Sequence, residues 1–187
     1  MGKLTYGMFM SLDGFLSGPT EHFDEEVSRF INDEMRRYGT EIYGRRMYEA
    51  MRYWETYEGQ QGGSSGFEDE FARIWKGLDK IVISSTLDRV SSGNTTLVRE
   101  FRADEIRQLK AASTRDISVA GPTLAAQFIN AGLVDEYALY SVPVVIGSGD
   151  PVFKDLEGRL DLDLVEERRF ASGMVFMRYE PGVTREA

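Results

Sequence analysis

The sequence contains no cysteine and a single histidine. The lack of cysteine excludes disulfides, thiolate nucleophiles and cysteine-ligated zinc, and it agrees with a cytoplasmic location. No apolar run approaches the roughly 18 residues of a membrane-spanning helix, and no signal peptide precedes the first predicted strand. Basic residues are also scarce, because 22 of them stand against 31 acidic ones and leave a net charge of −9. That deficit argues against a nucleic-acid partner, since such binders neutralise phosphates. We therefore expect neither a membrane nor a nucleic-acid partner, and no metal site.

Strand and helix patterns alternate along the chain, which is typical of an α/β fold. Strands are predicted at 3–11, 41–43, 80–84, 95–99, 116–119 and 134–144, and helices at 24–38, 45–51, 67–76, 103–111 and 122–131. Near the C-terminus, segments 160–170 and 174–179 flank Ala171-Ser172-Gly173, which is a hairpin signal. The sequence predicts one domain over 1–187, with a mostly parallel central sheet and an antiparallel C-terminal edge. A glycine- and serine-rich stretch at about 58–66 predicts a flexible loop.

Two predicted strands end in turns that suit a phosphate. Strand 116–119 runs into Ala120-Gly121-Pro122-Thr123-Leu124, a small-residue turn that opens a helix. The unpaired N–H groups and the positive dipole end of that helix favour an anion, although such turns also occur for packing reasons. Strand 80–84 ends in Ser84-Ser85-Thr86, whose hydroxyls suit phosphate or ribose oxygens but equally an ordinary turn.

A third junction carries two cations. Gly44 is followed by Arg45 and Arg46 in the first turn of a predicted helix, where positive charge opposes the macrodipole. A phosphate-rich ligand explains these arginines, because the guanidinium binds phosphate through a planar fork. Two surface arginines on a solvated face are the alternative. Since open α/β sheets bind ligands at the carboxyl ends of their strands, the three junctions predict one anion site.

Six short motifs in a fixed order give the chain a family resemblance. They are Ser11-Leu12-Asp13-Gly14, Gly44-Arg45-Arg46, Ile83-Ser84-Ser85, Val119-Ala120-Gly121-Pro122, Gly132-Leu133-Val134-Asp135-Glu136 and Pro143-Val144-Val145-Ile146-Gly147-Ser148-Gly149. With these motifs, nearly the whole chain resembles the dihydrofolate reductase-like superfamily, in particular the family of the riboflavin-biosynthesis reductase domain. The resemblance implies a three-layer α/β fold and NADPH as the cofactor.

The resemblance also assigns roles to individual residues. It implies that Gly44, Arg45 and Arg46 bind the cofactor phosphates. Ser84, Ser85 and Arg99 inherit the 2′-phosphate side of the adenosine. The pyrophosphate falls to the turn Ala120, Gly121, Pro122, Thr123 and Leu124.

Three positions depart from the family pattern. Ala120 stands where the reductases usually carry a first glycine, which is tolerated unless the backbone there needs a positive φ. Met47 stands where a threonine commonly follows the Gly-Arg-basic triplet. Gly7 stands where the riboflavin reductase has a lysine, and this departure bears on the ribosyl-phosphate substrate rather than on the cofactor.

The catalytic residue is the least determined part of the sequence. Asp13, at the end of the first strand, is the candidate for a substrate contact or proton relay, with ordinary Asp-Gly turn chemistry as the alternative. Folate reductases place a carboxylate on the first helix, and Asp24, Glu25 or Glu26 could occupy that area. The alternative is that these acids only stabilise the start of the helix, where negative charge is favourable.

The resulting functional hypothesis is an NADPH-dependent reductase of a pteridine- or pyrimidine-like heterocycle. The closest named reaction is the reduction of 5-amino-6-(5-phosphoribosylamino)uracil in riboflavin biosynthesis. The alternative is a non-catalytic nucleotide-binding or sensor module that keeps the reductase fold. Apolar strands near the C-terminus, together with the habit of relatives, predict a homodimer.

Overall fold

The computed structural model describes residues 1–17, 22–59 and 66–182. Eight strands form one sheet in the order β4-β3-β2-β5-β1-β6-β8-β7. Their bounds are β1 Leu4–Met10, β2 Tyr38–Gly44, β3 Asp79–Ile83, β4 Thr95–Val98, β5 Asp116–Ala120, β6 Glu136–Ser141, β7 Leu162–Arg169 and β8 Val175–Pro181. The strands from β4 to β6 pair in parallel, whereas β8 runs antiparallel to β6 and to β7. The predicted mostly parallel sheet with an antiparallel C-terminal edge is confirmed.

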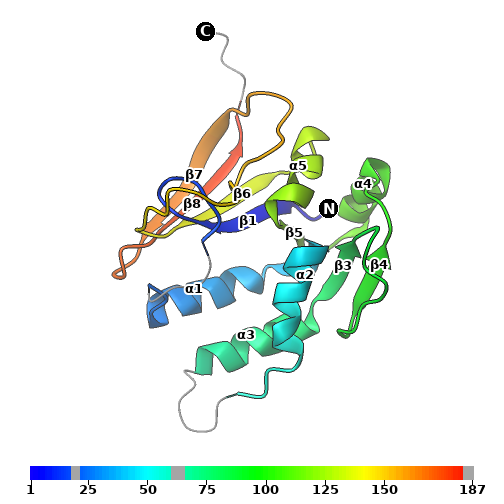
Figure 1. Ribbon diagram of the computed structural model, residues 1–187, viewed down its shortest axis with the longest axis horizontal. Helices are drawn as coiled ribbons and strands as arrows, with labels where there is room; N and C mark the ends of the chain where they lie inside the picture. Colours follow the sequence, from blue (N-terminus) through cyan, green and yellow to red (C-terminus); the bar gives the residue numbers. More distant parts are fainter. Residues whose placement is uncertain (18–21, 60–65, 183–187) are drawn as a thin grey trace.

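Helices cover both faces of the sheet and give the predicted three layers (Figure 1). They are α1 Glu25–Met35, α2 Arg45–Met51, the 3-10 helix η1 Arg52–Glu55, α3 Gly66–Gly77, α4 Ala103–Ala112 and α5 Pro122–Asn130. In Figure 1, α1 and α3 lie on one side of the sheet and α4 and α5 on the other. Across the described ranges, no helix combines the length and the apolar character needed to cross a bilayer.

Strand alternation divides the core between the two faces. On one face, Tyr6 and Met8 of β1 belong to the same buried cluster as Phe128 of α5. On the other face, Val27 of α1 packs with Phe176 of β8 in a second cluster. Burying each of the larger apolar side chains contributes about 1.5–3 kcal/mol to the stability of the fold, so the helices on both faces stabilise the sheet.

The first helix ends earlier than predicted. Asp24 is its N-cap and accepts a hydrogen bond from the N–H of Val27 at 2.9 Å. The predicted helix 24–38 stops at Met35, because Tyr38 already pairs with β5 and begins β2. Arg37, in the connection, donates to Glu136 of β6 at 2.9 Å. Partners distant in sequence therefore override the helical pattern at this junction.

Other boundaries differ in smaller ways. Strand β6 ends at Ser141 rather than at 144, since Pro143 has no N–H to continue the ladder. Helix α3 already begins at Gly66, the last residue of the predicted loop 58–66. Residues 60–65 of that loop lie outside the described residues. The 3-10 helix η1 was not predicted.

Candidate functional site

The sheet brings the predicted phosphate-binding residues into one row. In its register, Val98 of β4, Ile83 of β3 and Gly44 of β2 lie side by side, and Tyr43 lies beside Ala120 of β5. The residues that follow these on four neighbouring strands are Arg99, Ser84, Arg45 and Gly121. Four segments that are far apart in the sequence thus meet at one carboxyl edge.

The turn between β5 and α5 requires its glycine. Gly121 has φ +95° and is the N-cap of α5, with Pro122 in the first turn. A side chain at Gly121 would be strained at that φ, and its Cβ would lie 3.6 Å from the Cβ of Met47. Ala120 lies within β5, and the non-glycine residues with positive φ in the described chain are Asn94 and Asp155. Alanine therefore replaces the family's first glycine without strain.

The two arginines of the Gly-Arg-Arg motif have different surroundings. Arg45 donates from Nε to Glu49 Oε1 at 2.9 Å and from Nη1 to Thr86 Oγ1 at 3.2 Å. Its side chain is half-exposed at the edge of the sheet. Arg46 is 89% exposed, and its Nη1 lies 3.5 Å from Asp150 Oδ2 in the loop that follows β6. Arg45 is thus held by two hydrogen bonds, whereas Arg46 has one longer ion pair and a side chain that is almost fully exposed.

Ser84 and Arg99 lie in the row but are engaged by the loop between β3 and β4. The Oγ atom of Ser84 accepts from the N–H groups of Thr86 at 3.3 Å and Leu87 at 3.1 Å. Arg99 donates to the carbonyl of Leu87 at 2.6 Å and to that of Asp88 at 3.3 Å. Both residues hold the loop, and the hydroxyl that contacts Arg45 is that of Thr86. The sequence analysis named Thr86 among the three hydroxyl residues at the end of this strand. The resemblance, however, assigned cofactor binding to Ser84 and Ser85 and not to Thr86.

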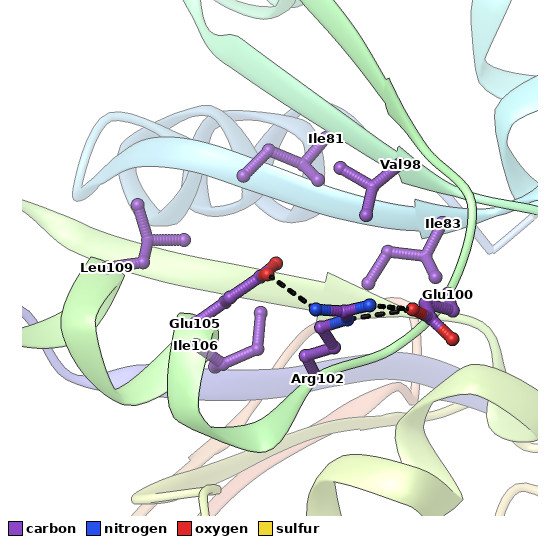
Figure 2. A pocket seen from close by; sticks show the side chains of 8 residues that line it. All are labelled: Ile81, Ile83, Val98, Glu100, Arg102, Glu105, Ile106 and Leu109. Atoms are coloured by element: carbon purple, nitrogen blue, oxygen red, sulfur yellow. Dashed lines mark hydrogen bonds and ion pairs between the residues drawn. The ribbon is translucent and has the colours of Figure 1, made fainter.

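A hollow of about 100 Å³ adjoins the row between β3, β4 and α4. Figure 2 shows its apolar side chains and an ionic rim, which comprise Ile81, Ile83, Val98, Ile106, Leu109, Glu100, Arg102 and Glu105. Arg102 bridges the rim by donating to Glu100 from Nε at 2.8 Å, with Glu105 Oε1 3.8 Å from its Nη1. Ile83 and Val98 immediately precede Ser84 and Arg99, so the hollow opens beside the row. Sequence reasoning missed this hollow, because no motif marks it.

Asp13 ties two loops together. Its carboxylate accepts from the N–H of Gly147 at 2.8 Å and from that of Ile146 at 3.3 Å. Hydrogen bonds from Ser11, Gly147 and Ile146 lower the pKa of Asp13, which keeps the carboxylate ionised near neutral pH. In this arrangement Asp13 anchors the loop after β6, and an ionised carboxylate does not donate a proton.

The three acids at the start of α1 have structural partners. Asp24 caps the helix, and Glu25 pairs with Arg29 at 2.5 Å on its exposed side. Glu26 accepts from Arg168 of β7 at 2.9 Å and from the N–H of Ala171 at 3.4 Å. These two hydrogen bonds and the charge of Arg168 lower the pKa of Glu26. The start of α1 is thereby fixed to the C-terminal hairpin rather than to the row.

A second cavity, of about 490 Å³, lies along α2 and η1. It is lined by Glu49, Arg52, Tyr53, Glu55, Thr56 and Ser91. Tyr53 is 57% exposed, whereas Trp54 packs on Phe71 with ring centroids 4.7 Å apart. Tyr53 therefore lines this cavity, whereas Trp54 packs against α3.

Comparisons with known proteins agree with this architecture. A pyrimidine reductase-like protein of Corynebacterium diphtheriae superposes with a TM-score of 0.69 at 15% identity, covering 98% of this chain and 93% of that one. A diaminohydroxyphosphoribosylaminopyrimidine deaminase/5-amino-6-(5-phosphoribosylamino)uracil reductase of Thermotoga maritima superposes with a TM-score of 0.65 at 12% identity, covering 97% of this chain and 57% of that one. At these identities the likeness shows a shared fold.

The sequence comparisons extend the likeness beyond the fold. The uncharacterized protein YyaP of Bacillus subtilis (strain 168) is 29% identical over 181 residues, which cover 95% of this chain and 94% of that one. The model of the RibD C-terminal domain matches residues 2–176. The chain therefore belongs to the RibD C-terminal domain family.

Proposed function

We propose that this protein is an NADPH-dependent reductase of a pteridine- or pyrimidine-like heterocycle. The observation that carries the proposal is the row of Arg99, Ser84, Arg45 and Gly121 on four adjacent strands. A long ligand with several phosphates matches such a row, because cations, hydroxyls and a helix start recur along one edge. Membership of the RibD C-terminal domain family supports a nicotinamide cofactor as that ligand.

In this proposal, the groups of the cofactor are distributed along the edge of the sheet. The pyrophosphate would lie at the turn Ala120–Leu124, where Gly121 lets the backbone approach closely and α5 presents its first N–H groups. Arg45 and Arg46 would supply the positive charge, and the Ser84–Thr86 segment the hydroxyls. The adenine ring would lie in the apolar hollow, where the planar guanidinium of Arg102 can stack on an aromatic ring.

When bound, the nicotinamide supplies the hydride, so the protein's task is to bind, orient and exclude water. Gly7 follows Tyr6 of β1, which pairs with Val119 of β5 near the row, and a Cβ there would meet no atom nearer than the carbonyl of Ala138 at 3.9 Å. This space on a central strand leaves room for a flat ring. Asp13 would act by holding the loop after β6 over this end of the edge.

Reduction of 5-amino-6-(5-phosphoribosylamino)uracil, which the name of the Thermotoga maritima protein includes, is the closest named reaction. Gly7 replaces the lysine that the riboflavin reductase carries at this position, so a heterocycle without the ribosyl phosphate fits this chain better. A substrate screen should therefore pair each pyrimidine or pteridine with its phosphorylated form.

Titration with NADPH and NADH, followed by tryptophan fluorescence and energy transfer to the nicotinamide, tests the proposal directly. We expect NADPH to bind in the micromolar range and NADH more weakly. The Arg45→Ala substitution should weaken the affinity for NADPH by about tenfold or more, because a charge-assisted contact with a phosphate is lost. Absence of binding by either cofactor would contradict the proposal, and equal weakening of both would remove Arg45 from the 2′-phosphate.

A non-catalytic nucleotide-binding or sensor module is the second candidate. The hydrogen bonds of Asp13 favour this non-catalytic candidate, because the carboxylate predicted as a proton relay already accepts from two backbone N–H groups. This candidate predicts NADPH binding without oxidation of the bound NADPH by any heterocycle in the paired screen. Turnover with one of them would exclude it.

A further inference from the structure

A band of polar side chains crosses one face of the central sheet. The register places Glu41 of β2 between Lys80 of β3 and Ser118 of β5, and it places Ser118 beside Thr5 of β1. Residues in register on neighbouring strands point to the same face, so these four side chains form one polar band. Each of them is at most 6% exposed. Polar groups buried to this degree normally have hydrogen-bond partners.

The two middle members of the polar band, Glu41 and Ser118, lack such partners. Lys80 donates to two backbone carbonyls, and Thr5 donates to Glu136 at 3.3 Å. Among the described residues, by contrast, no hydrogen bond reaches Glu41 or Ser118, and Oε2 of Glu41 is buried without a partner. Burial of an unpaired carboxyl group costs stability, so its presence in the core indicates a role in binding.

Space for a ligand lies next to this pair of residues. On the same face, Ala120 lies two residues beyond Ser118 and Gly7 lies two residues beyond Thr5, and both are partly exposed. A Cβ on Gly7 would meet no atom within 3.8 Å, because the nearest one is 3.9 Å away. Two residues along a strand span about 6.6 Å, which a single flat ring can bridge. A ring that lies over Gly7 and Ala120 therefore brings its edge to Ser118 and Glu41.

The protonation state of Glu41 determines which kind of ring edge it can bind. Burial raises the pKa of Glu41 to about 8, and the charge of Lys80 opposes this shift. Burial also lowers the pKa of Lys80, against the effect of Glu55, Asp79 and Tyr48. At neutral pH Glu41 is largely protonated, and a protonated carboxyl group presents one O–H donor beside one acceptor. Its complement is a lactam edge, in which a ring C=O stands next to a ring N–H.

We propose that Glu41 and Ser118 bind the lactam edge of the heterocyclic substrate. The O–H of Glu41 donates to the ring C=O, its other oxygen accepts from the ring N–H, and the Ser118 hydroxyl bonds to the same edge. This inference rests on the proposed function and narrows its substrate class to pyrimidines or pteridines with a lactam edge. An amidinium edge, which presents two N–H donors, would instead need the ionised carboxylate.

The test measures the affinity for uracil, which carries a lactam edge, by isothermal titration calorimetry with and without NADPH. Glu41→Met removes the donor and the acceptor at similar side-chain length and should weaken the affinity by about tenfold or more. Glu41→Gln always presents an N–H and a C=O and should keep most of the affinity. Ser118→Ala should weaken it by about threefold. The wild type should bind 1,3-dimethyluracil, which has no ring N–H, about tenfold more weakly than uracil.

The pH dependence separates this binding role from a purely structural one. With a pKa of about 8, the protonated fraction of Glu41 falls from nearly all at about pH 6.5 to about a quarter at about pH 8.5. The affinity of the wild type for uracil should therefore fall about fourfold over this range, whereas that of Glu41→Gln should stay constant. A fall that persists in Glu41→Gln would come from another group, such as Lys80, and would overturn the inference.

Ser141→Ala is the matched control, because it removes another buried strand hydroxyl on the opposite face of the sheet. It should leave the affinity for uracil unchanged, and urea denaturation shows whether each variant is folded. Unchanged affinity in folded Glu41→Met, or no binding of uracil by the wild type, overturns the inference, while NADPH binding leaves the proposed function standing. A wild type that binds no NADPH overturns the proposed function and, with it, the assignment of this edge to a substrate.

Discussion

Glu41 is a buried carboxyl group without a hydrogen-bond partner for one of its oxygens. It lies on β2 between Ser118 of β5 and Lys80 of β3, is 4% exposed, and its Oε2 is unpaired among the described residues. The ammonium group of the neighbouring Lys80 instead donates to the carbonyls of Trp75 at 3.0 Å and Leu78 at 2.8 Å. Burial raises the pKa of Glu41 to about 8, and the charge of Lys80 opposes that shift. The group is therefore largely protonated at neutral pH.

This burial predicts a pH-dependent stability. Since the pKa of Glu41 is about 8 in the folded protein and 4.5 ordinarily, its penalty is absent below about pH 4.5 and grows as the pH rises toward 8. The free energy of unfolding should fall by roughly 3–5 kcal/mol across that window from this group. Glu41→Gln cannot ionise, so urea denaturation should show it more stable than wild type above pH 8 and similar to it near pH 5.

Glu167→Gln, at an exposed site on β7, serves as the control for Glu41→Gln and should follow the wild-type pH dependence. Parallel pH profiles for wild type and Glu41→Gln would show that Glu41 ionises normally. The sequence places Glu41 in a strand, but its burial could not be predicted. Alternate residues of a strand face opposite layers, and Trp75 of α3, which lies against Lys80 and donates to the Tyr43 hydroxyl two residues after Glu41, is not placed there by sequence pattern alone.

At the scale of elements, Glu136, the first residue of β6, joins three others. Its carboxylate accepts from Lys3 beside β1 at 2.9 Å, from Arg37 before β2 at 2.9 Å and from Arg178 of β8 at 3.4 Å. Burial opposes its ionisation, but hydrogen bonds from Lys3 and Arg37 together with nearby positive charge lower the pKa of Glu136. The ionised form is thus the one that the fold uses.

Loss of this carboxylate should strongly destabilise the protein. Glu136→Ala removes the carboxylate shared by Lys3, Arg37 and Arg178, while Arg178 keeps Glu34 and Glu166 as partners. Breaking a buried pair from one side costs about 3–5 kcal/mol, which sets the upper limit here, and chemical denaturation would measure the loss as a lower free energy of unfolding. Glu180→Ala removes the other acceptor of Lys3 at an exposed site and should cost less than about 1 kcal/mol. Similar losses for the two variants would contradict a special role of Glu136.

Elements were predictable where the signal is local. The turn Gly121-Pro122 marks the start of α5, and Ala171-Ser172-Gly173 marks the hairpin of β7 and β8, because both depend on backbone chemistry within a few residues. The start of β2 at Tyr38 was missed, since it depends on pairing with Asp116 of β5.

The candidate site was likewise predictable where its signal is local and not where it depends on contacts between distant residues. Its row was predictable from strand ends, whereas the partners of Ser84 and Arg99 lie in a loop without a sequence signature.

At the scale of the whole molecule, the sheet has two dissimilar edges. On one side β4 adjoins the hollow and the candidate cofactor row. On the other side β7 is paired with β8 alone and is exposed along nearly its whole length. Leu164 and Val165 on β7 are 49% and 50% exposed. An edge strand with exposed apolar residues offers unpaired backbone groups to another chain.

The predicted homodimer should therefore form through β7. Two copies related by a two-fold axis could pair their β7 edges and cover Leu164 and Val165 at a distance from the cofactor row. Light scattering after size-exclusion chromatography should give twice the mass of one chain, and the double variant Leu164→Lys/Val165→Lys should give a single chain that still binds NADPH. Leu12→Lys, which alters an exposed apolar residue in the loop after β1, should leave the dimer intact. A wild-type monomer would contradict dimer formation, and a double variant that remains dimeric would place the interface elsewhere.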